Sequence, residues 1–136
     1  MDRLSKEHRS WNMSRIRSKN TKPEMRVRLL LHRMGYRYRI HVRTLAGCPD
    51  IVIRKAQTVI FVHGCFWHRH KGCKFAYSPK SRLKFWNDKF NDNVARDIRH
   101  RAELKKSGWH VRVIWECEVD NELRLTKKLA RFLGER

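Results

Sequence analysis

Acidic residues are scarce in this chain of 136 residues. It holds 13 Asp and Glu against 33 Lys and Arg, which gives a formal net charge of +20 at pH 7. A compact domain with this imbalance repels itself unless an anionic partner neutralises it. Phosphates are the commonest such anion, so the composition favours a nucleic acid as partner and disfavours an ordinary small-molecule enzyme.

Long apolar runs are also missing. No stretch approaches the roughly 18 consecutive apolar residues of a membrane span. No basic segment followed by an apolar one opens the chain, as an export signal would. We therefore expect a cytoplasmic protein without a membrane partner. The length suits a single domain, and 40% hydrophobic residues are enough to form its core.

Cysteines are few, and two of them lie close to histidines. In a cytosolic chain four cysteines predict a metal site or isolated thiols rather than disulfides. Five potential ligands fall within one short segment, namely His63, Cys65, His68, His70 and Cys73. Thiolate and imidazole are the usual tetrahedral ligands of structural zinc.

The favoured zinc ligands are Cys65, His70, Cys73 and Cys117. Cys65 and Cys73 bracket a tight loop. Cys117 follows a predicted strand, and it reaches the same edge of the sheet if that strand neighbours the one ending at Val62. Cys48 competes for the fourth place. The alternative to a zinc site is a set of reduced thiols packed as small hydrophobic side chains.

The hydrophobic patterns predict a basic arm over residues 1–20 and one α/β domain over residues 21–136. A helix begins after Thr21, an N-cap with Glu24 three residues later, and ends at Gly35. Apolar spacing then predicts strands at 36–43, 50–53, 58–62 and 109–115, and helices at 82–107 and 121–133. This order implies a mixed β-sheet flanked by helices.

The helix over 82–107 is long enough to break near Asn91. Its apolar residues recur every four positions, so we expect one stripe to face the core. That stripe is Phe90, Val94, Ile98 and Ala102.

Asp50 is the most informative acidic residue, because it enters a strand in a chain that otherwise avoids negative charge. A carboxylate there suits a hard cation such as magnesium. Hairpin pairing of 50–53 with 59–62 would place Asp50 beside His63 or Val62, so that Asp50, His63 and His68 surround one phosphate. A neutral histidine accepts a proton from water near neutral pH. His63 as a simple loop histidine is the alternative.

Asp97 offers a partner for His68. Trp86, Lys89, Asn93 and Asp97 follow one another at helical spacing and share one face. A carboxylate bonded to His68 would fix its tautomer and raise its basicity. The alternative is a surface ion pair within the same helix.

Large aromatic side chains stand among the basic groups. Phe66 and Trp67 lie inside the metal loop, and Trp86 lies on the adjacent helix. Such rings stack on bases or wedge between base pairs. The alternative is a small second core over the zinc.

These motifs resemble those of the very-short-patch-repair (Vsr) mismatch endonucleases over nearly the whole chain, from about Ser10 to Glu118. The matching residues are Asn12-Met13 with Arg15-Ile16, Thr21, Glu24, Pro49-Asp50, His63-Gly64-Cys65-Phe66-Trp67-His68, His70, Cys73, Trp86, Asn93, Asp97, Gly108-Trp109 and Trp115-Glu116-Cys117. The resemblance implies a restriction-endonuclease-like fold with a structural zinc. It also implies a bacterial, nucleoid-associated hydrolase for DNA repair. Its reaction would be a magnesium-dependent nick 5′ of the thymine in a T·G mismatch left by 5-methylcytosine deamination.

The resemblance also assigns roles to single residues. Asp50 would bind magnesium, helped by the carbonyl of Val62; His68 would be the general base, oriented by Asp97; His63 and Glu24 would assist. Zinc would take the cysteine and histidine set named above. The residues expected to contact the mismatch are Met13, Phe66, Trp67, Trp86, Lys89 and Asn93.

The chain lacks the acidic-x-Lys step of the wider restriction-endonuclease superfamily, because Phe61-Val62-His63 stands in its place. Metal affinity should therefore depend on bound DNA phosphate.

We expect a monomer that acts on double-stranded DNA, with repair proteins as partners after the nick. The alternatives are a non-catalytic zinc module that binds nucleic acid and a nuclease of the same fold with another DNA substrate.

Overall fold

The computed structural model describes residues 20–65, 68–73, 76 and 80–133. The basic arm expected over residues 1–20 lies outside this part of the chain, except for Asn20. The elements, in chain order, are α2 (Lys22–Arg33), β1 (Arg39–Ile40), β2 (Ile51–Ile53), the short 3-10 helix η1 (Arg54–Ala56), β3 (Thr58–His63), α3 (Leu83–Lys106), β4 (His110–Trp115), η2 (Glu116–Glu118) and α4 (Glu122–Phe132). The predicted order of helix, three strands, helix, strand, helix is confirmed.

The four strands form one mixed sheet in the order β1-β2-β3-β4. The β1–β2 and β2–β3 pairs are antiparallel, and β3 and β4 run parallel. The start of β2 and the ends of β3 and β4 therefore meet at one edge of the sheet. His63, the last residue of β3, lies opposite Trp115, the last residue of β4.

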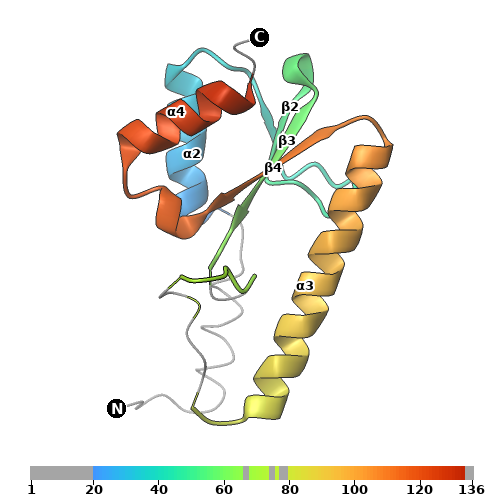
Figure 1. The fold of residues 1–136 in the computed structure, drawn as a ribbon. Helices are drawn as coiled ribbons and strands as arrows, with labels where there is room; N and C mark the ends of the chain where they lie inside the picture. Colours follow the sequence, from blue (N-terminus) through green and yellow to red (C-terminus); the bar gives the residue numbers. More distant parts are fainter. Residues whose placement is uncertain (1–19, 66–67, 74–75, 77–79, 134–136) are drawn as a thin grey trace.

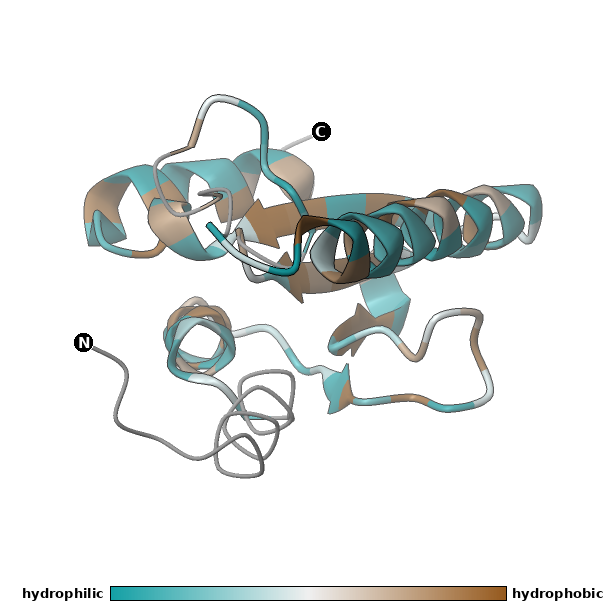
Figure 2. Ribbon diagram, turned by 90° about the horizontal axis from the view of Figure 1, so that it is seen from below, coloured by the Kyte–Doolittle hydropathy of each residue, from teal (hydrophilic) through white to brown (hydrophobic). Residues whose placement is uncertain are grey.

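Helices cover both faces of this sheet (Figure 1). Helices α2 and α4 lie on one side and α3 lies on the other. The strands between them are largely hydrophobic (Figure 2). The core toward α2 and α4 includes Val27, Leu31, Ile51, Ile53, Ile60, Ile114, Leu125 and Leu129, and the core toward α3 includes Val52, Val59, Phe61 and Leu104.

Helix α2 begins as predicted, but Glu24 does more than cap it. The Thr21 hydroxyl accepts a hydrogen bond from the Glu24 backbone N–H at 3.4 Å. The Glu24 side chain is buried, with the residue only 2% exposed. Burying a carboxylate without partners is energetically unfavourable. Glu24 is therefore expected to have polar or charged partners inside the molecule in addition to its place at the helix end.

The strand predicted over 36–43 is mostly wrong, because only Arg39 and Ile40 pair with β2. Tyr36 and Tyr38 pack against the core as loop residues. His41 adopts a positive φ of 47°, which bends the chain out of the strand. The alternation of polar and apolar residues in this segment therefore predicted which side chains are buried, but it did not predict which residues pair in a strand.

Helix α3 is unbroken over its 24 residues, so no break occurs near Asn91. The predicted stripe is only partly correct, because Phe90 is buried but Ile98 is 55% exposed. The helix extends well beyond the sheet (Figure 1). Leu104, near its C-terminus, packs with Val52, Val59 and Phe61 in the core on the α3 side of the sheet. Asp97, on the neighbouring face predicted with Trp86, Lys89 and Asn93, is half-buried instead. No helix of the described residues is long and apolar enough to cross a membrane.

Candidate active site and metal clusters

Three groups of metal-binding or titratable side chains lie in the described part of the chain. Within each group the potential ligand atoms lie within 4.8 Å of one another. The groups are Cys65, His70, Cys73 and Cys117; His63, His68 and Asp97; and Glu24, His41 and Asp50. All three use residues at or near the sheet edge where β2 starts and β3 and β4 end.

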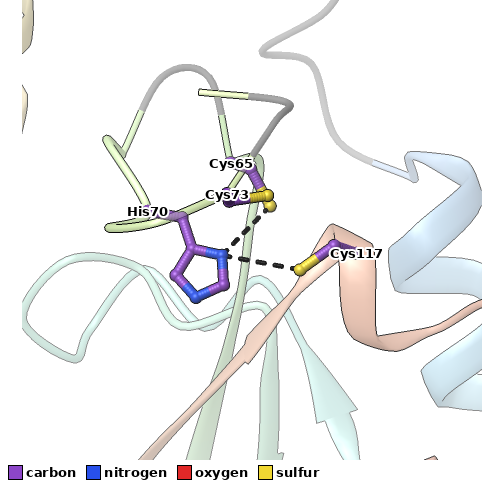
Figure 3. Close-up of side chains that lie close together, drawn as sticks. All are labelled: Cys65, His70, Cys73 and Cys117. Carbon is purple, nitrogen blue, oxygen red and sulfur yellow. Dashed lines mark hydrogen bonds between the residues drawn. The ribbon is translucent and has the colours of Figure 1, made fainter. Parts of the chain in front are cut away.

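The first group is the cysteine and histidine cluster predicted from the sequence (Figure 3). The Nδ1 atom of His70 lies 3.6 Å from the Sγ of Cys65 and 3.5 Å from the Sγ of Cys117. Cys65 and Cys117 each stand two residues after paired strand ends, so the parallel register brings them together. Cys48 is not part of the cluster. Three thiols and one imidazole around a common centre fit a structural zinc, and this group could hold one.

Neighbouring side chains fix the cluster. The His70 ring stacks on Trp115 at 4.2 Å between centroids and 7° between planes. The Cys65 backbone N–H donates to Glu116 Oε1 at 2.9 Å. Burial raises the pKa of Cys65 to about 12, with the neighbouring thiols adding to the effect. The ligand form is the thiolate, so a cation that binds here must displace protons from the thiols.

The second group joins the end of β3 to α3. The rings of His63 and His68 stack at 3.8 Å with an angle of 5°. His68 Nδ1 lies 2.5 Å from Asp97 Oδ2, which places a carboxylate behind the imidazole. Arg101 donates to the backbone carbonyl of Asp97 rather than to its side chain. Asp97 therefore turns its carboxylate to His68 rather than to a basic neighbour on its own helix.

Charge states in this group follow from burial and mutual contact. Burial, together with the nearby His68, lowers the pKa of His63 to about 3, so that His63 is neutral at physiological pH. Burial alone would raise the pKa of Asp97, but the hydrogen bond with His68 and the surrounding positive charges lower it. The pair is therefore an ionised carboxylate in contact with an imidazole, beside a second, uncharged imidazole.

The third group centres on two carboxylates. The backbone N–H of Val62 donates to Asp50 Oδ2 at 2.7 Å, which is the contact expected from the hairpin. Burial raises the pKa of Asp50 to about 6, and the nearby Glu24 adds to this rise. The hydrogen bond from the Val62 N–H opposes the rise in the pKa, and so do His41 and His68. Asp50 therefore lies within electrostatic reach of both the Glu24 carboxylate and the His68 imidazole.

The residues expected to contact DNA are only partly described. Met13, Phe66 and Trp67 lie outside the described residues. Trp86 is half-buried and stacks near Phe90, with 5.9 Å between ring centroids. Lys89 is exposed and Asn93 is half-buried, and both lie on α3.

Sequence reasoning missed His41, which joins Glu24 and Asp50. Its signal was weak, because a histidine in an alternating basic segment reads as one more solvent-facing cation. The sequence gives Glu116 no role beyond its place in the Trp115-Glu116-Cys117 motif, although its side chain accepts the backbone N–H of Cys65.

Comparison with known proteins places these features in context. The family model of the DNA mismatch endonuclease Vsr matches residues 1–74. The type II nicking enzyme V.XorIIP of Xanthomonas oryzae pv. oryzae is 50% identical over 132 residues, covering 97% of this chain and 96% of that protein. The type II nicking enzyme V.NmeAIP of Neisseria meningitidis is 45% identical and covers 93% of this chain and 90% of its own. The DNA mismatch endonuclease Vsr of Escherichia coli is 40% identical, covering 87% and 75%.

Among solved structures, the catalytic domain of the homing endonuclease I-Bth0305I matches with a TM-score of 0.59. It is 23% identical and covers 83% of this chain and 94% of its own, which shows a shared fold. The predicted nuclease fold with a mixed sheet flanked by helices is thereby confirmed. With its family model matched over more than half of the sequence and its relatives matched along most of their length, the chain belongs to the Vsr DNA mismatch endonuclease family and is a DNA nicking endonuclease.

Proposed function

We propose that this chain nicks one strand of double-stranded DNA on the 5′ side of the thymine in a T·G mismatch, with magnesium as cofactor. The observation that carries the proposal is the chain of contacts at one edge of the sheet: Asp50 accepts the Val62 N–H, the next residue His63 stacks on His68, and His68 bonds to Asp97. Asp50 can bind a cation, and His68 can accept a proton. Both are needed to break a phosphodiester bond with water.

The carboxylates of Asp50 and Glu24 fit a divalent cation. The two carboxylates lie close together, and burial and the nearby Glu24 both raise the pKa of Asp50. A cation between them would stabilise the ionised carboxylates against burial and mutual repulsion. Val62 donates its N–H to Asp50, and in an extended strand its carbonyl points to the same side, toward the same centre. Magnesium bound there would neutralise the charge that develops on the scissile phosphate.

His68 is the proposed general base. Its Nδ1 bonds to Asp97, which fixes the ring and leaves Nε2 to accept a proton from the attacking water. His63 stays uncharged and stacks on His68, so it can hold the ring in place and donate a hydrogen bond to the phosphate. Asp97 keeps its charge and stabilises the imidazolium that forms.

Zinc is the proposed structural cofactor, because it would fix the loop that carries the base. His68 lies between Cys65 and His70, two members of the cluster. Four protein ligands leave no open position on the ion, so the zinc itself would take no part in cleavage. The loop also contains Phe66 and Trp67. We propose that these two residues and Trp86 enter the base stack from the major groove, and that Met13 of the arm enters from the minor groove.

Asp97→Ala is expected to lower the nicking rate about 10–100-fold with little change in DNA affinity. The reason is that His68 loses the group that sets its tautomer and orientation. The measurement is single-turnover nicking of a T·G duplex, with a DNA-binding assay on the same variant. Asp88→Ala, an exposed carboxylate on the same helix, is the matched control and should leave the rate unchanged. A normal rate in Asp97→Ala would exclude the role given to the pair.

The substrate is tested with duplexes that differ in one base pair. We expect magnesium-dependent cutting of the thymine strand in a T·G duplex, and no cutting of the T·A or C·G duplex. Binding should weaken steeply as salt rises, because about one counterion is released for each phosphate contact. Equal nicking of matched and mismatched duplexes would remove the mismatch from the proposal.

A second candidate function has support from the comparisons. The relatives at 50% and 45% identity carry the name type II nicking enzyme, which states no mismatch. A nicking nuclease of this fold with another DNA substrate is therefore the alternative. A panel of T·G, fully paired and branched duplexes of one sequence separates the two. Cutting of a paired or branched duplex at a rate above that of T·G favours the second.

A further inference from the structure

His41 is a half-buried histidine with a buried Nε2 atom, and the proposed chemistry does not use it. It follows β1, and its backbone N–H donates to the carbonyl of Asp50 at 3.1 Å. Its side chain is 10% exposed, and its Nε2 lies 2.8 Å from Glu24 Oε2. That contact lacks hydrogen-bond geometry, so Nε2 is a buried atom without a hydrogen-bond partner among the described residues.

Both features of His41 cost stability. A buried nitrogen without a hydrogen bond has lost its contact with water and gained nothing in its place. A non-glycine residue in the left-handed region, here at φ 47°, is strained. Features of this kind persist where the surrounding structure imposes them, and they cluster at functional sites.

The orientation of the His41 ring indicates a possible role in binding a cation. Its ring nitrogen and the carboxylate oxygens of Glu24 and Asp50 all lie within 4.8 Å of one another. Three such atoms can surround one cation. Arg28 also approaches Glu24 Oε2, at 3.3 Å, so Glu24 already has a positive neighbour and does not need His41 for charge balance.

We propose that His41 is a ligand of the divalent cation bound by Glu24 and Asp50, and that it shifts the preference of this centre from magnesium toward manganese or cobalt. Imidazole nitrogen suits first-row transition metals, whereas carboxylate and carbonyl oxygens suit magnesium. A site with two carboxylates alone would discriminate little between Mg²⁺ and Mn²⁺. The inference rests on the proposed cation site, and it adds the nitrogen ligand and the metal preference.

The test measures cation binding by the zinc-loaded full-length protein in the absence of DNA, so that the protein ligands alone set the preference, and at cation concentrations high enough to offset the missing phosphate. Zinc loading keeps manganese out of the cysteine cluster. Binding of Mn²⁺ is followed by the loss of the free-ion signal in electron paramagnetic resonance, and binding of Mg²⁺ by its competition with Mn²⁺. We expect Mn²⁺ to bind about 10-fold or more tightly than Mg²⁺.

The informative variant is His41→Gln. A glutamine fits the backbone, since Gln57 adopts a φ of 48° in the same chain, and its oxygen can replace the ring nitrogen. We expect Mn²⁺ affinity to fall about 10–100-fold and Mg²⁺ affinity to change less than about 3-fold. His110→Gln, an exposed histidine at the start of β4, should change neither. Circular dichroism of each variant verifies the fold.

The outcomes separate this inference from the proposed function. If Asp50→Asn abolishes Mn²⁺ binding but His41→Gln lowers both cations equally or neither, the cation site stands and the role of His41 as a selective ligand is wrong. If Asp50→Asn binds Mn²⁺ as the unaltered chain does, the cation site itself is wrong, and the proposed function fails with it.

Discussion

Replacing Asp50 with Asn is expected to abolish nicking and to make the folded chain more stable. The variant removes the charge that holds the cation, and we expect a loss of about 1,000-fold or more in the nicking rate. The same charge is unfavourable in the folded state, since burial raises its pKa from 3.8 to about 6. Asparagine keeps the size of the side chain and an oxygen that can accept from the Val62 N–H.

The sign of the stability change follows from proton binding. Between pH 3.8 and 6 the folded chain retains a proton on Asp50 that the unfolded chain has lost. This group therefore lowers the free energy of unfolding as pH rises through that window, and its effect is complete above pH 6. About two pKa units correspond to at most about 3 kcal/mol, so we expect a gain of about 1–3 kcal/mol for Asp50→Asn at pH 7.

Thermal unfolding at pH 4 and pH 7 in magnesium-free buffer measures this effect. The two proteins should differ most at pH 7 and little at pH 4. Added Mg²⁺ should stabilise the unaltered chain and leave Asp50→Asn unchanged. Asp120→Asn, a 73% exposed carboxylate side chain far along the sequence, is the control with little expected change. A less stable Asp50→Asn at pH 7 would show that Asp50 stabilises the fold and is not a strained cation ligand.

Much of the candidate site was predictable because it depends on strand pairing. The predicted hairpin of 50–53 with 59–62 places Asp50 beside Val62. The observed register, with Ile51 opposite Ile60, is shifted by one residue, but Asp50 still accepts the Val62 N–H. A parallel partner for β3 brings Cys117 to Cys65, since both follow paired strand ends by two residues. Period-two alternation indicates how neighbouring strands pair. This pairing brings residues that are far apart in the sequence together at the site.

The sequence predictions are wrong where a residue's burial does not follow from its secondary structure. The segment 36–43 alternates like a strand, but its tyrosines pack as loop residues and His41 turns the chain away. Helix α3 has an apolar repeat, yet the sheet is too small to cover it, and Ile98 is exposed while Asp97 faces the site. A sequence pattern gives the period of an element, but only the size and position of its neighbours decide which face is covered.

Cys117→Ser is expected to remove zinc, lower stability and stop nicking. Cys117 is the one member of the cluster that comes from beyond α3, so the ion would tie the loop after β3 to the end of β4. Zinc binding contributes about 10–16 kcal/mol in small zinc domains. We expect a loss of only several kcal/mol here, because the two hydrophobic clusters of this chain do not depend on the metal. Nicking should fall at least about 100-fold, since a base displaced by about 1 Å loses that much.

Hydrogen exchange can tell loss of the loop from loss of the whole fold. The amides of His68 and His70 bond to the carbonyls of Gly64 and Cys65 inside the loop. In Cys117→Ser these two amides should lose protection, while the amides that join β3 to β4 keep theirs. Cys48→Ser, which changes a half-buried cysteine outside the cluster, should retain one zinc per chain by elemental analysis and normal exchange in the loop. If the unaltered chain purifies without zinc, or if Cys117→Ser retains it, the ligand set is wrong. The position of His68 would then have to come from its contacts with His63 and Asp97 and from its backbone bond to Gly64, without the ion.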